Sequence, residues 1–147
     1  MVRVGIVGLG YWGPNLVRCY SELPNCKVTA VCDRSVDQLL KIKDRFPGVC
    51  PFENFETMLQ SQKIDAVVIA TPTHSHFNLA MMALELGIHV FVEKPLAETA
   101  EQCEKMIQMA DATSTILFVG HVFLHSSPVT KLRALIDEGE LGRINYI

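Results

Sequence analysis

A glycine-rich segment near the N-terminus has the residue types and spacing of a phosphate-binding turn. Gly8-Leu9-Gly10-Tyr11-Trp12-Gly13 fits the pattern G-x-G-x-x-G and directly follows a predicted strand that ends at Val7. When a strand precedes this pattern and a helix follows it, glycine allows a tight turn and lets the backbone approach a diphosphate. The start of that helix offers free N–H groups and a partial positive charge. We therefore predict a dinucleotide-binding loop made by Gly8, Gly10, Tyr11, Trp12 and Gly13.

An acidic residue, Asp33, stands 20 positions after the last of these glycines, at the end of the second predicted strand. A carboxylate at this place can accept hydrogen bonds from the adenosine ribose, and it repels a 2′-phosphate, so Asp33 favours NAD over NADP. The guanidinium of Arg34 can neutralise such a phosphate or stack on adenine, which keeps NADP possible. From these residues alone, two alternatives stay open. Asp33 could cap a helix before Ser35, or the loop could bind S-adenosylmethionine in a methyltransferase-like fold.

The elements that must position these residues alternate between short apolar runs and segments with helical periodicity. Most of the short runs are apolar throughout, which is typical of strands covered on both faces of a parallel sheet. We predict strands at residues 2–7, 27–32, 65–70, 89–92 and 115–119, with a shorter one near Val49. This alternation predicts an α/β fold of Rossmann type, a doubly wound parallel sheet with helices on both faces. Ligands of such sheets bind beyond the carboxyl ends of the strands.

Helices between the strands are indicated by capping residues and apolar stripes. Ser35 and Thr99 each precede a glutamine by 3 positions, which is the spacing of a capping box. Gly87 and Gly139 are expected to end helices. The stripes predicted to face the core are Phe77, Ala80, Met81 and Leu84, then Cys103, Met106, Ile107 and Ala110, and finally Val129, Leu132 and Ile136.

The composition is that of an ordinary globular protein, with 49% hydrophobic and 20% charged residues and a net charge of −3. With this charge balance the chain lacks the excess of basic residues that attracts nucleic acid. No apolar run approaches the roughly 18 residues that a membrane-spanning helix needs. The 5 cysteines include no C-x-x-C pair, and no histidine pair has metal-ligand spacing, so we predict no metal site. Reduced cysteines favour a cytoplasmic protein.

Two further segments carry a resemblance to a known family. They are Thr71-Pro72-Thr73-His74-Ser75-His76 and the run from Gly87 to Ala97, which contains Glu93-Lys94-Pro95 at a strand end. Together with the glycine loop they resemble the N-terminal domain of the glucose–fructose oxidoreductase/inositol dehydrogenase (Gfo/Idh/MocA) family. The resemblance covers essentially the whole chain. It implies NAD(P)-dependent hydride transfer between nicotinamide and a hydroxyl of a sugar, nucleotide-sugar or polyol.

The resemblance also implies roles for single residues. It places Thr71, Pro72 and His76 against the cofactor, and it places Lys94 near both the nicotinamide and the reacting hydroxyl. Thr73 replaces the usual asparagine of the family and is expected to cap the next helix. An ammonium group beside an alcohol can stabilise the alkoxide that develops as hydride leaves, so Lys94 is the predicted catalytic residue.

Neighbouring residues complete the predicted site. Glu93 is expected to orient Lys94 by a charge-assisted hydrogen bond and to belong to the cofactor-binding set. His121, which follows the last predicted strand, is the best local candidate to face the nicotinamide. A sharp turn that aims Lys94 inward suggests a cis peptide bond before Pro95.

The resemblance divides the chain into two parts. Residues 1–122 are expected to form the NAD(P)-binding domain. Residues 123–147 are expected to form a crossover helix and the first strand of a truncated substrate domain, through which the protein forms a homo-oligomer. This fragment alone is expected to bind cofactor without turnover. A non-catalytic dinucleotide sensor stays open as an alternative, and Lys94→Ala separates the two because it abolishes turnover only in an enzyme.

Overall fold

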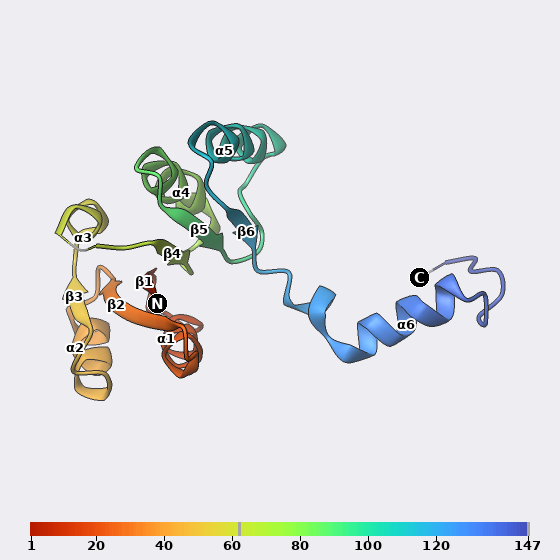
Figure 1. Ribbon diagram of the computed structural model, residues 1–147, viewed down its shortest axis with the longest axis horizontal. Coiled ribbons are helices and arrows are strands. Elements are labelled where there is room, and N and C mark those ends of the chain that lie inside the picture. The colour runs from red at the N-terminus through yellow and green to blue at the C-terminus, as the bar shows by residue number, and fades with distance from the viewer. Residues whose placement is uncertain (62, 147) are drawn as a thin grey trace.

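The computed structural model describes residues 1–61 and 63–146 and contains a parallel sheet with helices on both faces (Figure 1). The 6 strands of this described part lie in the order β3-β2-β1-β4-β5-β6, and each neighbouring pair is parallel. Their bounds are β1 Val2–Val7, β2 Cys26–Cys32, β3 Cys50–Phe52, β4 Ala66–Ile69, β5 His89–Val92 and β6 Leu117–Val119. The predicted doubly wound α/β fold is confirmed, and the strand bounds differ from the predicted ones by a few residues at most.

The helices divide between the two faces as the crossover connections require. Their bounds are α1 Gly13–Glu22, α2 Val36–Arg45, α3 Phe55–Ser61, α4 His76–Glu85, α5 Ala100–Thr113 and α6 Ser127–Asp137, with 3₁₀ turns η1 Thr73–Ser75 and η2 Val122–His125. Helices α1 and α2 pack on one face, and α3, α4 and α5 pack on the other. The chain reverses its winding between β1 and β4, so the ends of these two strands form the switch point where ligands bind.

Each face of the sheet has its own apolar core because successive strand residues point to opposite sides. In β1, Ile6 packs with Val17 of α1, whereas Val7 packs on the other face. In β4, Val68 joins the α1 side and Ile69 joins the side of α4 and α5. Both core faces are closed to solvent at the centre of the sheet, where Ile6 and Ile69 are fully buried. This double coverage explains why the strands are apolar without alternation.

The predicted helix caps are present in two of the helices. The Ser35 hydroxyl accepts from the Gln38 N–H, and the Thr99 hydroxyl accepts from the Gln102 N–H. Gly87 adopts a φ of 71° directly after the last turn of α4. These local signals are reliable because each depends on residues within one turn of chain.

Two local predictions about α4 and α5 are wrong. Thr73 does not cap α4, because it lies inside η1 and Ser75 occupies the N-cap position of α4. The hydroxyl of Ser75 donates to the Pro72 carbonyl and forms a second hydrogen bond with the Thr71 hydroxyl, which can act as the donor, so the turn is closed by two hydrogen bonds. Ile107 is 49% exposed, so the core stripe of α5 is narrower than predicted.

Helix α6 extends away from the sheet after η2 (Figure 1). Its predicted core stripe, Val129, Leu132 and Ile136, is largely exposed. Residues 143–146 contain no strand, because a strand needs a hydrogen-bonded neighbour, and Ile147 lies outside the described residues. The division of the chain at residue 122 stays a prediction. Within the described residues, no helix has both the length and the apolar character that crossing a membrane requires.

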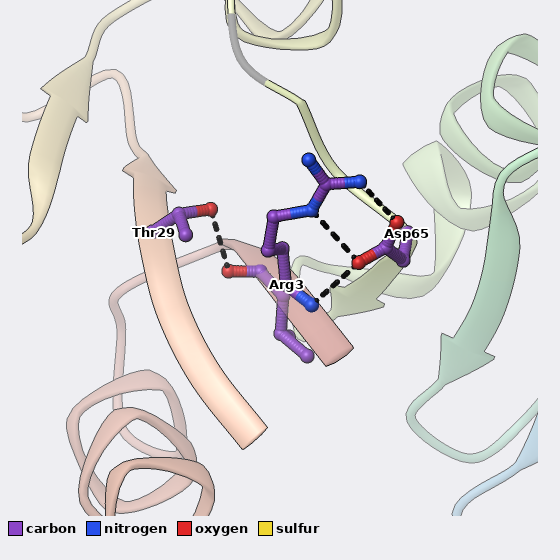
Figure 2. Close-up of polar contacts among 4 residues, drawn as sticks. Arg3, Thr29 and Asp65 are labelled. Atoms are coloured by element: carbon purple, nitrogen blue, oxygen red, sulfur yellow. Dashed lines mark hydrogen bonds and ion pairs between the residues drawn. The ribbon is translucent and has the colours of Figure 1, made fainter. Parts of the chain in front are cut away.

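A bidentate ion pair joins Arg3 of β1 to Asp65, the residue directly before β4, at the end of the sheet opposite the switch point (Figure 2). Arg3 donates from Nε to Asp65 Oδ2 at 2.9 Å and from Nη2 to Oδ1 at 2.5 Å, and its backbone N–H also donates to Oδ2. On the neighbouring strand, the Thr29 hydroxyl donates to the Val4 carbonyl at 3.5 Å. The side-chain and then the backbone hydrogen bonds from Arg3 hold the pKa of the Asp65 carboxyl well below its usual range.

This pair predicts a specific dependence of stability on pH. A carboxyl whose pKa is lower in the folded chain stabilises the fold above its unfolded value of about 3.9, and this contribution is lost as the pH falls through the folded value. Asp65→Asn should therefore unfold at lower urea than the wild type at about pH 7, and the difference should shrink as the pH approaches about 2.

Urea unfolding at several pH values measures this effect. Glu101→Gln is the control, because it removes an exposed pair with Lys105 on one face of α5 and should change stability less. A difference between wild type and Asp65→Asn that is independent of pH would contradict the assignment to the carboxylate charge.

Candidate cofactor site at the carboxyl ends of the strands

The glycine loop after β1 is held against the end of β4 by a very close backbone approach. Gly8 has a φ of 92°, and a Cβ there would lie 2.7 Å from the carbonyl carbon and oxygen of Ala70 and from the Thr71 nitrogen. A Cβ at Gly13, at the start of α1, would overlap the Gly8 carbonyl oxygen. These two glycines therefore let the loop pack onto the strand ends and onto α1.

Gly10 differs from the other two glycines of the loop. It is exposed, and a Cβ at this position would meet nothing within 4 Å. No side chain caps α1 at its N-cap residue Trp12, whereas hydroxyls cap α2 and α5. Packing within the described residues therefore does not require a glycine at position 10. The start of α1 beside it has N–H groups without a capping side chain, and such a helix start can bind an anion.

Asp33 follows β2 and ties the glycine loop to the second strand. Its Oδ2 accepts from the Leu9 N–H at 2.6 Å, and its Oδ1 accepts from the Ser35 N–H at 2.8 Å. The N-cap residue of α2 is Ser35 and not Asp33. The alternative role of Asp33 as a helix cap is therefore limited to its hydrogen bond with the Ser35 N–H. Each carboxylate oxygen can accept a second hydrogen bond, so Asp33 can brace the loop and still bind a ribose hydroxyl.

A cavity of about 540 Å³, the first cavity, lies at the switch point of the sheet. It is lined by 6 of the residues predicted to bind the cofactor, namely Gly8, Gly10, Asp33, Arg34, Thr71 and Pro72. Its volume lies within the usual range of about 300 to 1,000 Å³ for small-molecule sites. The lining also includes Glu53 and Glu56, which the sequence analysis did not single out. The one feature of the sequence that could have identified these two residues is their position directly after the short third strand.

A second cavity, of about 360 Å³, lies beside the end of β5. It is lined by Lys94, Gly120 and His121 together with the apolar side chains of η2 and Val129. Lys94 is exposed, and the peptide bond between Lys94 and Pro95 is cis, as predicted. The structure therefore brings the predicted catalytic lysine and His121 to one apolar hollow.

His76 lies at the first position of α4, and its ring is 1% exposed. Its Nδ1 is 2.9 Å from the Pro95 carbonyl oxygen, and its Nε2 is 2.8 Å from the Thr71 carbonyl oxygen. Both ring nitrogens therefore face protein carbonyls, and the predicted contact of His76 with the cofactor stays a prediction.

Glu93 does not form the predicted hydrogen bond with Lys94 among the described residues. A Cβ at Gly120 would lie 3.3 Å from Glu93 Oε2, so the carboxylate faces β6. Burial, and then the nearby Cys26 and Glu93, raise the pKa of the Tyr20 hydroxyl to about 12. The carboxylate of Glu93 therefore lies beside Gly120, directly after β6.

Two loop aromatics project from the glycine loop into solvent. Tyr11 and Trp12 are 85% and 57% exposed, and their rings contact each other edge to face at 5.3 Å. Their predicted part in cofactor binding stays a prediction. In the described residues, no cluster of histidine, cysteine and acidic side chains could hold a metal ion.

The oxidoreductase family Gfo/Idh/MocA, described by its NAD-binding Rossmann fold, has a model that matches residues 2–121. The chain belongs to this family. As a Gfo/Idh/MocA member it is an NAD-binding Rossmann domain of an oxidoreductase, which confirms the resemblance seen in the glycine loop, the Thr71-Pro72 segment and the Glu93-Lys94-Pro95 segment. The assignment favours an oxidoreductase over the methyltransferase-like alternative.

Several characterised proteins are similar to this Gfo/Idh/MocA chain. It is 32% identical, over 99% of its length and 37% of the relative's, to 1-carboxy-3-chloro-3,4-dihydroxycyclo hexa-1,5-diene dehydrogenase of Comamonas testosteroni. A scyllo-inositol dehydrogenase from Lactobacillus casei, solved with NAD(H) and scyllo-inositol, is 29% identical with a TM-score of 0.89 over 98% of this chain and 43% of that one. A 3-ketoreductase from Actinomadura kijaniata, solved with TDP-benzene and NADP, is 28% identical with a TM-score of 0.90 over 97% of this chain and 46% of that one.

The chain spans less than half the length of each of these relatives. Relatives of this Gfo/Idh/MocA domain have been crystallised with NAD(H) and with NADP. Family membership therefore establishes dinucleotide binding as the role of the domain and leaves the choice between the two cofactors to its own residues.

Proposed function

We propose that the first cavity binds the adenosine and diphosphate of NAD, and that Lys94 serves hydride transfer between its nicotinamide and a hydroxyl of a sugar, nucleotide-sugar or polyol. The observation that carries the proposal is the open position at Gly10 beside the uncapped start of α1. Protein packing does not require glycine there, whereas a diphosphate lying on the helix start does.

The residues around the first cavity fit the parts of the dinucleotide. The amides at the start of α1 would bind the diphosphate, and the free acceptor positions of Asp33 would bind the adenosine ribose. Glu53 and Glu56 add negative charge to the same lining, which disfavours a 2′-phosphate beside Asp33. Arg34 is a positive charge in the same lining and would attract a 2′-phosphate. We propose NAD as the preferred cofactor because the lining holds three carboxylates and this single guanidinium.

Lys94 and His121 are the proposed reaction side of the site. The bound nicotinamide supplies or accepts the hydride. Lys94 would stabilise the oxygen of the reacting hydroxyl as negative charge develops on it, and its exposed ammonium can exchange protons with water. His121 lines the same cavity and is proposed to face the nicotinamide.

The substrate, the assembly and the location of the whole protein are also proposals. A substrate with a hydroxyl group fits the exposed lysine that lines the second cavity. Similar proteins include an inositol dehydrogenase and a reductase solved with a TDP compound. We retain the homo-oligomer predicted from the resemblance. The free thiols of the 5 cysteines support the proposed cytoplasmic location.

Ligand-induced stabilisation tests the function directly on this chain. NADH should raise the midpoint of thermal unfolding, by an amount that grows with ligand concentration, whereas S-adenosylmethionine should not. The chain has a single tryptophan, Trp12, in the glycine loop, so energy transfer from Trp12 to reduced nicotinamide gives an independent titration. Stabilisation by S-adenosylmethionine without any by NADH would overturn the proposal.

Asp33→Asn should shift the cofactor preference toward NADPH. The amide keeps an acceptor oxygen but removes the negative charge that repels a 2′-phosphate, so we expect the ratio of NADPH to NADH affinity to rise about tenfold. Asp37→Asn is the matched control, because Asp37 lies in the first turn of α2 and does not line the first cavity. Titrations of both variants with both cofactors measure the ratio, and an unchanged ratio in Asp33→Asn would refute this role.

A further inference from the structure

The two loops proposed to meet the cofactor are joined by one buried side chain. The first is the Thr71-Pro72 turn, which lines the first cavity, and the second is the Lys94 loop, defined as residues 93–96 after β5. The ring of His76 lies between them, 2.8 Å from the Thr71 carbonyl and 2.9 Å from the Pro95 carbonyl. Its near-complete burial means that water cannot replace either contact without opening the structure.

The two contacts are not equivalent for the loops that they hold. The Thr71-Pro72 turn has further hydrogen bonds, because the Ser75 hydroxyl reaches the Thr71 hydroxyl and the Pro72 carbonyl, each at 2.7 Å. For the Pro95 carbonyl, His76 Nδ1 is the hydrogen-bond partner found within the described residues. A carbonyl only accepts, so the Pro95 carbonyl is bound in the tautomer that carries the proton on Nδ1, which is the tautomer that the proposal assigns. Proline has no N–H of its own to anchor this part of the chain. The position of the Lys94 loop therefore depends on His76 more than the position of the turn does.

We propose that His76 is a positioning residue that holds the Lys94 loop through its Nδ1–H and thereby sets the nicotinamide end of the site relative to the adenosine end. This inference rests on the proposed function, since it assigns the nicotinamide to the side of Lys94. It predicts that loss of the Nδ1 donor weakens binding of the complete dinucleotide while the adenosine half still binds.

Two substitutions separate the two ring nitrogens. The side-chain amide of asparagine can place its N–H near the position of Nδ1, and the longer glutamine can place its N–H near the position of Nε2. His76→Gln therefore loses the contact with Pro95, whereas His76→Asn retains it and loses the contact with Thr71. Each variant loses one of the two contacts between the ring and a carbonyl at this buried position, so both should lose thermal stability.

Titrations with NADH and with ADP, which carries only the adenosine diphosphate half, give the decisive comparison. We expect NADH affinity to fall about tenfold in His76→Gln and no more than about threefold in His76→Asn, with ADP affinity within about twofold of wild type in both. His89→Gln is the matched control. Its Nδ1 accepts from the Ile116 N–H at the opposite end of β5, so this variant should lose stability without losing NADH affinity.

The outcomes are distinct. Equal loss of NADH affinity in the two His76 variants, or equal loss of ADP and NADH affinity, would overturn the positioning role. If the wild type binds neither NADH nor ADP, the proposed function itself fails. Should His76→Gln not fold, the nitrogen resonances of His76 in the labelled wild-type chain decide the matter, because the proposal requires a proton on Nδ1 and an unprotonated Nδ1 would refute it.

Discussion

Gly10→Ala should reduce NADH affinity by at least about a hundredfold, which corresponds to about 2.8 kcal/mol, and leave the stability of the free chain nearly unchanged. The added methyl group meets no protein atom within 4 Å, so folding does not resist it. In the complex the same methyl group would occupy the space through which a diphosphate approaches the start of α1. Energy transfer from Trp12 to NADH measures the affinity, and urea unfolding measures the stability.

Gly48→Ala is the matched control for this substitution. Gly48 is also free of atoms within 4 Å of a built Cβ, and its φ is not in the left-handed region, but it lies before β3 and does not line the first cavity. It should change neither affinity nor stability appreciably. NADH binding by Gly10→Ala at wild-type affinity would show that the dinucleotide does not lie on this loop.

Gly8→Ala should destabilise the fold by about 3 to 5 kcal/mol, because two costs act at the same residue. The φ of 92° is unfavourable for a residue with a side chain, and the Cβ would lie 2.7 Å from backbone atoms of Ala70 and Thr71, which cannot rotate away. The glycine loop and β4 would have to separate, which would also widen the first cavity. Urea unfolding monitored by circular dichroism gives the free energy of unfolding.

Gly87→Ala separates the two costs. Gly87 has a φ of 71° but no atom within 4 Å of a built Cβ, so this variant should lose only the conformational part, about 1 to 2 kcal/mol. A similar loss in Gly8→Ala and Gly87→Ala would mean that the close approach to Ala70 is relieved at little cost. The glycine loop would then be more adaptable than its packing indicates.

Local patterns in the chain predicted the elements and the general place of the site. The apolar runs identified the strands because coverage on both faces requires hydrophobic residues at successive positions. The glycine pattern after β1 and the acid after β2 located the first cavity, since the carboxyl ends of parallel strands share one edge of the sheet. Predictions that depended on side-chain direction were less successful. Ile107 faces solvent, and Glu93 turns toward Gly120.

By itself, then, the sequence determined the doubly wound fold, the family and the identity of the loops that meet at the switch point, because periodicity and short motifs are properties of neighbouring residues. Only the tertiary structure decided how those loops are held together. The Asp33 carboxylate binds the Leu9 N–H across 24 positions, and His76 reaches Pro95 across 19. Such contacts depend on the exact path of two loops and on which polar groups are buried without water, and no local pattern encodes either.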